Sequence, residues 1–186
     1  MNSSVKLGIG FALIWMIVKM TMHLMSIDDK TLYYISIALI LLLIPLGIFL
    51  GIRNSQKRGN TIFFDDLKEG MKPAAIMVIL ISVFTFIYYK EMGSSTIEAW
   101  KTERNNREIE RIEAAGGWDK FVEKNDNQQM KEISYDDYVD KFRDNGELVF
   151  APSSVAVIGL MGWTLVSLFY AFLLTLFYRK ILVKFT

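Results

Sequence analysis

The chain has 186 residues, of which 52% are hydrophobic and 22% charged, with a formal net charge of +1, one histidine and no cysteine. The lack of cysteine excludes disulfide frameworks and thiolate metal sites, and the near-neutral charge gives no nucleic-acid footprint. The apolar residues gather in four long runs that a soluble enzyme fold does not show, so we predict an integral membrane protein.

The first two predicted spans are joined by a very short connection. Residues 7–27 carry one charge and residues 31–52 carry none, and about 20 apolar residues cross a bilayer as a helix. The connection between them forces span two to return antiparallel beside span one. The first run is too long for a signal peptide and lacks small residues at a cleavage spacing, so we expect it to be retained.

The third and fourth predicted spans follow two polar connections. Residues 53–72 form a basic turn, within which 63–67 predicts a short interfacial helix. Residues 73–89 are uncharged and predict span three, with Pro73 in its first turn, where the missing N–H costs nothing. Residues 148–178 are also uncharged and predict span four. We therefore divide the chain into 1–90 with three spans, 91–147 as a polar loop, and 148–186 with span four and a tail.

The polar loop carries helix signals at both ends. Ser95 opens a capping-box pattern and Gly116-Gly117 predicts the end of that helix, while Ser134 opens another that Asn145-Gly146 would end. An apolar stripe with helical spacing follows the second start, and a shorter amphipathic piece lies between the two. The stripe is Tyr135, Tyr138, Val139 and Phe142, and the shorter piece contains Trp118, Phe121 and Val122.

These patterns predict an all-α fold, an integral membrane four-helix bundle with a small helical extracytoplasmic loop domain. The orientation follows from the positive-inside rule, because the 53–72 turn and the C-terminal tail carry most of the basic residues of the short loops. We expect a multi-pass protein of the bacterial inner (cytoplasmic) membrane with both termini cytoplasmic.

The arrangement resembles a family of uncharacterised four-span bacterial inner-membrane proteins, a domain of unknown function. The residues that carry the resemblance are Arg53, Lys57, Arg58 and Gly59 in the basic turn, Phe64 and Gly70 before span three, and Pro152 before span four. The chain departs from the pattern at Asp66-Leu67, where a small residue and an aromatic are more usual. The resemblance covers most of the chain, implies the topology and supplies no activity.

Two features within the spans are candidate functional residues. Lys19 and His23 share one face of span one, and an ionisable residue inside a span is a functional candidate by default. The lysine could contact a carboxylate on a partner chain or relay a proton or an anion. Its stem could instead reach Asp28, Asp29 or lipid phosphate at the outer surface.

Small residues in spans two and four are typical of close helix packing. Gly47 and Gly51 form a G-x-x-x-G pair, and Gly159 lies on a small-residue face of span four. Such faces serve packing within the bundle or, alternatively, a dimer interface.

No pattern predicts a catalytic, cofactor-binding or metal-ligating residue. The acidic residues of the polar loop, such as Asp136, Asp137 and Asp140, lack calcium-loop spacing and read as a solvated face. We therefore expect a non-enzymatic protein without cofactors.

The leading hypothesis is an accessory or scaffold subunit that contacts partners through its outer helical loop. The alternative is a small oligomeric transporter or channel. Expected partners are the lipid bilayer and a protein partner or a second copy, without nucleic acid.

Overall fold

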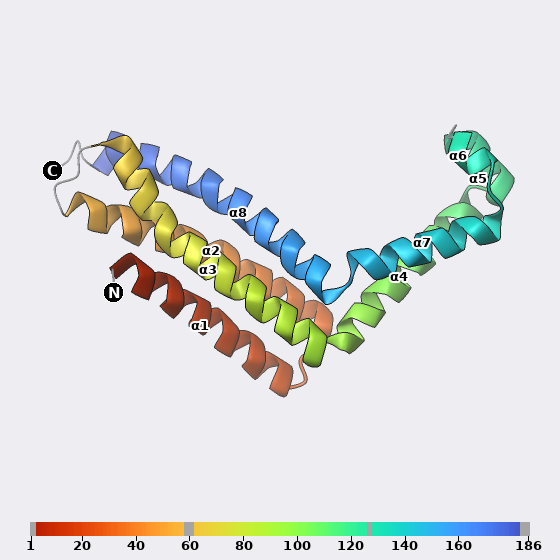
Figure 1. Cartoon of the computed structure of the whole chain (residues 1–186), viewed down its shortest axis with the longest axis horizontal. Helices are drawn as coiled ribbons and strands as arrows, with labels where there is room; N and C mark the ends of the chain where they lie inside the picture. Colours follow the sequence, from red (N-terminus) through yellow and green to blue (C-terminus); the bar gives the residue numbers. More distant parts are fainter. Residues whose placement is uncertain (1–2, 58–61, 126–127, 183–186) are drawn as a thin grey trace. The chain divides into compact units, whose positions relative to one another are not determined.

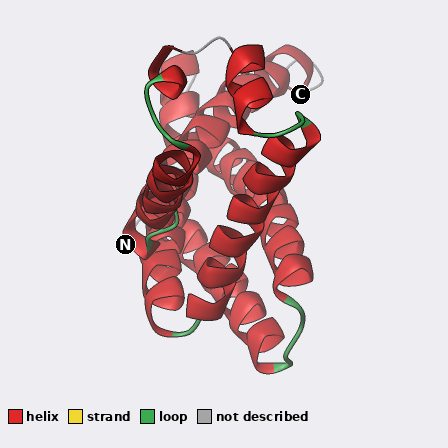
Figure 2. Cartoon of the chain, turned by 90° about the vertical axis from the view of Figure 1, so that its right-hand side faces the viewer, coloured by secondary structure: helices red, strands yellow, loops and turns green. Residues whose placement is uncertain are grey.

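The computed structural model describes residues 3–57, 62–125 and 128–182, and every regular element within these ranges is a helix (Figures 1 and 2). Arg58 and Gly59 of the basic turn lie outside the described residues, as does the basic tail residue Lys184. The elements are α1 (Ser3–Leu24), α2 (Asp29–Gln56), α3 (Phe63–Glu91), α4 (Ser94–Ala114), α5 (Trp118–Asn125), α6 (Gln128–Lys131), α7 (Tyr135–Val149), α8 (Pro152–Phe177) and the π-helical turn η1 (Tyr178–Leu182).

The chain forms two compact units. The membrane unit comprises Met1–Thr85 and Ala156–Thr186, and the polar unit comprises Phe86–Val155. Four helices are long and apolar enough to cross a membrane, namely α1, α2, α3 and the stretch Pro152–Lys180. The prediction of four apolar spans is therefore confirmed by their length and composition, and the protein is a multi-pass membrane protein of all-helical architecture in the part of the chain that the structure describes.

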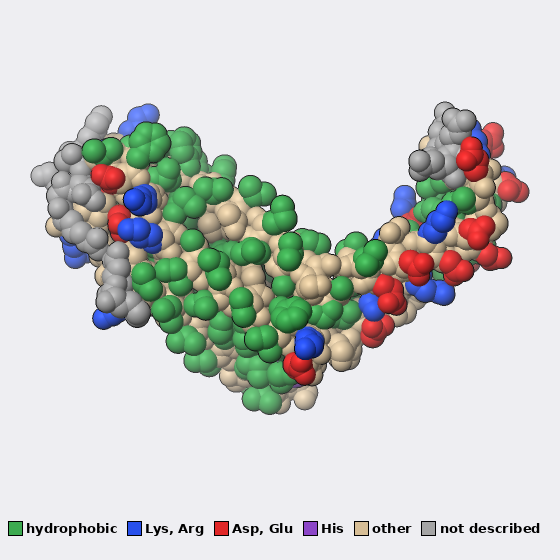
Figure 3. All heavy atoms as spheres, in the orientation of Figure 1, with side chains coloured by type: hydrophobic (Ala, Val, Ile, Leu, Met, Phe, Trp, Pro, Cys, Tyr) green, Lys and Arg blue, Asp and Glu red, His purple; other side chains and the backbone are tan. Residues whose placement is uncertain are grey.

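The core of the membrane unit is built around α2. Five of its side chains, Ile40, Leu43, Ile44, Ile48 and Ile52, are buried in the main apolar cluster, together with residues of α1, α3 and α8. Many other large apolar side chains of these helices are exposed, and green side chains cover this part of the space-filling view (Figure 3). A bilayer supplies the apolar surroundings that such exposed side chains need.

The first helix is tied to its neighbours through Trp15. Its indole Nε1 donates to the backbone oxygen of Ser36 on α2 at 3.0 Å, and its ring meets Phe84 on α3 edge-on at 5.7 Å. A buried indole N–H needs such a partner, because no water is available in a hydrocarbon layer.

The segment before span three differs from its prediction. Residues 63–67 do not form a separate interfacial helix, because α3 runs without a break from Phe63 to Glu91 and holds Pro73 in its interior. A proline there removes the N–H that would bond the Glu69 carbonyl. That carbonyl faces Gly51 of α2, where a Cβ would lie only 2.5 Å from its oxygen. Gly8 of α1 approaches the Pro73 carbonyl in the same way, with a Cβ at 2.6 Å. Glycines thus let α1 and α2 pack closely around the proline.

The fourth span is the least covered helix of the membrane unit. Only 11% of its most apolar window is buried, against 44% for α2 and 39% for α3. Its buried positions are mostly small or hydroxylic, such as Ala171 and Thr175. Most of its surface is therefore left to lipid.

The polar unit is helical, as predicted, but two of its boundaries differ. Gly93, not Ser95, precedes the first residue of α4, and it makes no side-chain cap. The Gly116-Gly117 stop is confirmed, with both residues at positive φ. Ser134 caps α7 by accepting a hydrogen bond from the Asp137 amide, as the pattern predicted. The helix then continues through Gly146 to Val149, because a glycine within a helix is tolerated where packing compensates.

Candidate functional site

Among the described residues of the polar unit, one carboxylate is buried in the interior. Glu108 on α4 is 7% exposed. The hydroxyl of Tyr138 on α7 donates to its Oε1 at 2.7 Å, and Arg111 Nη1 donates to its Oε2 at 2.7 Å. Burial first and the adjacent carboxylate second raise the pKa of Tyr138 to about 12. Both carboxylate oxygens are satisfied, so this group stabilises the contact between α4 and α7.

An aromatic cluster surrounds the tyrosine. The Trp118 ring lies 4.9 Å from that of Tyr138 and 6.0 Å from that of Phe121, measured between centroids. Tyr135 meets the same indole edge-on at 6.1 Å. Tyr135 and Tyr138 of the predicted stripe therefore pack against α5. Because such pairs favour fixed ring geometries, the cluster holds the two helices in one arrangement.

Two basic side chains join α4 to α7. Arg104 places its guanidinium 3.9 Å from the centre of the Phe142 ring and donates from Nη1 to the Phe142 carbonyl at 3.1 Å. Gly146 provides the space, because a Cβ there would lie 2.7 Å from Nη1. Lys101 Nζ lies 3.8 Å from Glu147 Oε1 on α7. It also donates to Glu98 of its own helix at 2.8 Å, and this hydrogen bond is the main cause that raises the pKa of Lys101 above the usual range.

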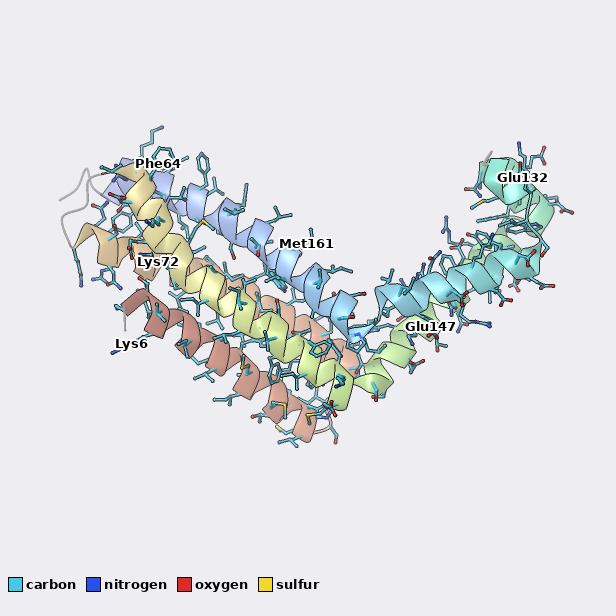
Figure 4. The ribbon with its side chains drawn as sticks, in the orientation of Figure 1. Lys6, Phe64, Lys72, Glu132, Glu147 and Met161 are labelled. Atoms are coloured by element: carbon cyan, nitrogen blue, oxygen red, sulfur yellow. The ribbon has the colours of Figure 1, made fainter. Side chains whose placement is uncertain are left out.

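The surface of the polar unit is acidic. Residues 90–147 contain 15 acidic and 10 basic residues, and in the described part every acidic side chain except Glu108 is exposed. Figure 3 shows these carboxylates along α4 and α7. The unit also has an open hollow of about 470 Å³, and one of its lining residues, Glu132, is labelled in Figure 4. Its lining residues are Met130, Glu132, Ile133, Tyr138, Lys141, Phe142 and Asn145. The unit thus combines a fixed interior with an exposed surface of mixed apolar and charged character.

A second polar cluster lies in the membrane unit, where α2 ends and α3 begins. Asp66 is fully buried. Its Oδ2 accepts hydrogen bonds from Arg179 Nε at 2.7 Å and from the Gln56 amide, and Arg179 Nη2 lies 2.7 Å from it without making a hydrogen bond. The other oxygen, Oδ1, has no hydrogen-bond partner among the described residues. This ion pair connects the start of α3 to the turn that ends α8.

A neighbouring carboxylate on α3 is also compensated. Glu69 pairs with Lys72 one turn later, and Ser4 of α1 donates to its Oε2 at 3.4 Å. The two acidic residues that face the bundle at this end are therefore neutralised by basic partners of the same unit.

The residues singled out from the sequence lie in the membrane unit. Lys19 is only 4% exposed, and its ammonium nitrogen lies 5.2 Å from the Trp15 ring centre. His23 is half-buried on the same helix. Gly51 packs against the α3 backbone as described above, and Gly47 faces the Phe11 ring, with a Cβ at 3.3 Å. A Cβ on Gly159 would meet only Trp163 of its own helix, at 3.9 Å.

The polar and aromatic contacts described above hold helices to one another. Among residues 3–57, 62–125 and 128–182, no group of three or more histidine and carboxylate side chains could hold a metal ion. Sequence reasoning did not find the Asp66–Arg179 pair, whose members are 113 residues apart. The sequence indicated this position only through Asp66-Leu67, where the chain departs from the pattern of the family that it resembles. The Glu108–Tyr138 bond was also missed, because nothing local distinguishes Glu108 from the other glutamates of its helix.

Residues 6–180 match the family described as "Protein of unknown function (DUF4199)". No curated protein and no solved structure matches the chain.

Proposed function

The chain belongs to the DUF4199 family of proteins of unknown function, and on that premise we propose that it is a non-enzymatic accessory or scaffold subunit of the bacterial inner membrane. In this proposal both termini are cytoplasmic, and the polar unit is the extracytoplasmic surface on which a protein partner docks.

The observation that carries the proposal is the internal packing of the polar unit. A tether between spans needs no buried carboxylate and no aromatic cluster, yet Glu108, Tyr138 and Trp118 fix α4, α5 and α7 to one another. A preorganised surface loses less entropy on binding than a flexible one does. The exposed acidic residues and the hollow beside α7 favour a partner that presents basic and apolar side chains.

Site-specific photo-crosslinking in native membranes tests this proposal. A photoreactive amino acid replaces Lys141, which lines the hollow, and in a matched control it replaces Glu103, an exposed residue of α4 that does not line it. We expect a discrete protein adduct from position 141 that is weaker or absent at position 103. Adducts with lipid alone, or identical adducts from both positions, would contradict a specific docking surface.

The alternative, a small oligomeric transporter or channel, rests on a different observation. Lys19 is a buried basic residue within an apolar span, and such residues mark ion pathways in some membrane proteins. An anion pathway requires its charge, so Lys19→Met would abolish a conductance of the reconstituted protein. If the wild type conducts nothing in vesicles, this alternative loses its support.

A further inference from the structure

One end of the membrane unit carries exposed basic side chains that form no ion pair with a described residue. They come from the start of α1, the end of α2, the start of α3 and the turn after α8. We call them the basic patch, and its members are Lys6, Arg53, Lys57, Lys68 and Lys180. None of them makes an ion pair with another described residue. Lys6 and Lys72 are labelled at this end in Figure 4.

The acidic residues of the same end are largely withdrawn from the surface. Asp66 is fully buried against Arg179, and Glu69 pairs with Lys72. Among the described residues of this end, only the half-buried Asp65 remains to oppose the patch. The positive charge is therefore a property of the folded end, where internal pairs neutralise Asp66 and Glu69 and leave the outer cations without a carboxylate partner among the described residues.

Exposed apolar side chains lie among these cations. Phe64 is 73% exposed and Ile62 is 59% exposed. Phe64 and Lys68 are four residues apart on α3 and so share one face of the helix. Phe63 packs against Phe172 of α8 at 6.1 Å, which keeps the start of α3 beside the bundle. A basic, aromatic surface at the ends of apolar helices lies where phospholipid headgroups meet the hydrocarbon layer.

We propose that this end of the protein binds the phosphodiester headgroups of anionic phospholipids, with the ammonium and guanidinium groups of the basic patch on the phosphates and Phe64 inserted at the acyl boundary. The proposal goes beyond the scaffold function and does not depend on it. An acidic soluble protein would satisfy the cations equally well, but it would leave Phe64 and Ile62 unexplained. Each basic side chain next to an anionic surface strengthens association by roughly fivefold.

The test compares lipid selectivity of the full chain in phosphatidylcholine vesicles. Spin-labelled phosphatidylglycerol and spin-labelled phosphatidylcholine are added separately, and electron paramagnetic resonance measures the fraction of each that the protein immobilises. We expect the wild type to immobilise a severalfold larger fraction of the phosphatidylglycerol than of the phosphatidylcholine. The Lys57→Gln/Lys68→Gln variant should lower this ratio of immobilised fractions toward one. The matched control, Lys120→Gln/Lys124→Gln, removes two exposed charges from the polar unit and should keep the wild-type ratio.

Two results would overturn the proposal. One is equal immobilisation of the two spin-labelled lipids by the wild type, whether or not an acidic protein co-purifies bound to the basic patch. The other is an equal ratio in the wild type and in the patch variant. Circular dichroism checks that both double variants keep the wild-type helix content, which is expected because all four side chains are exposed.

Discussion

The hydroxyl of Tyr138 offers the most direct test of packing in the polar unit. Tyr138→Phe keeps the ring beside Trp118 and removes only the donor to the buried Glu108. Hydrogen bonds to charged groups contribute about 1.5–3 kcal/mol, and removing one leaves a buried oxygen unsatisfied. We expect the lower part of that range, because Arg111 still donates to the same carboxylate.

The assay is proteolysis of the purified full chain in increasing urea, with cleavage between residues 98 and 123 as the readout. The Tyr138→Phe chain should be cleaved at lower urea than the wild type. Tyr135→Phe is the matched control on the same helix, because Tyr135 is exposed and its hydroxyl makes no hydrogen bond with a described residue. Identical urea midpoints for the wild type and Tyr138→Phe would refute the reasoning.

The same variant predicts a pH dependence. The folded state raises the pKa of Tyr138 from 10.0 to about 12, so the unfolded chain releases this proton first. The stability that the phenol contributes is therefore complete below about pH 10 and is lost as the pH rises toward 12. The difference in stability between the wild type and Tyr138→Phe should therefore shrink across this pH interval. A gap that stays constant to pH 12 would show that the phenol is not held by Glu108.

Three further predictions concern packing. Gly51→Ala brings a Cβ to 2.5 Å from the Glu69 carbonyl oxygen, so it should lower the free energy of unfolding by about 1–3 kcal/mol and lower the melting temperature in detergent. Gly10→Ala is the control, because a Cβ there would meet nothing within 4 Å, and it should melt like the wild type. Arg179→Ala leaves Asp66 buried without its cation and should cost about 3–5 kcal/mol, whereas Lys180→Ala next to it should be nearly neutral in the same melt. Phe121→Ala leaves a cavity where a side chain only 5% exposed was packed and should destabilise the polar unit by about 3–5 kcal/mol, so protease should cut that unit while the spans stay in the membrane fraction. Equal cleavage of the wild type would show that the unit is not packed.

Much of the fold could be predicted from local pattern. Uncharged runs of sufficient length define spans, because each charge in hydrocarbon is costly and each backbone group must bond within its own helix. The Ser134 cap and the Gly116-Gly117 stop were also readable, since both satisfy backbone groups close to them in the chain. These features depend on neighbours in sequence, and for that reason the sequence alone reveals them.

The features that were missed depend on tertiary contacts. Pro73 was expected to begin a helix, but α3 continues through it because Gly8 and Gly51 pack against the backbone around the proline. Gly146 was expected to end α7, but it lies within the helix, where it makes room for Arg104. The burial of Asp66 depends on Arg179, far along the chain. Local propensity is a weak guide where packing of distant segments decides.

The measurement that tests the central claim most directly is the side of the membrane on which the polar unit lies. The chain has no native cysteine, so single cysteines report position without interference. Lys57 and Lys124 are both exposed and are therefore suitable positions for these cysteines. In intact cells with a permeable outer layer, an impermeant maleimide should label Lys124→Cys directly and Lys57→Cys only after the inner membrane is opened. Labelling of Lys57→Cys alone in intact cells would place the polar unit in the cytoplasm and contradict the account.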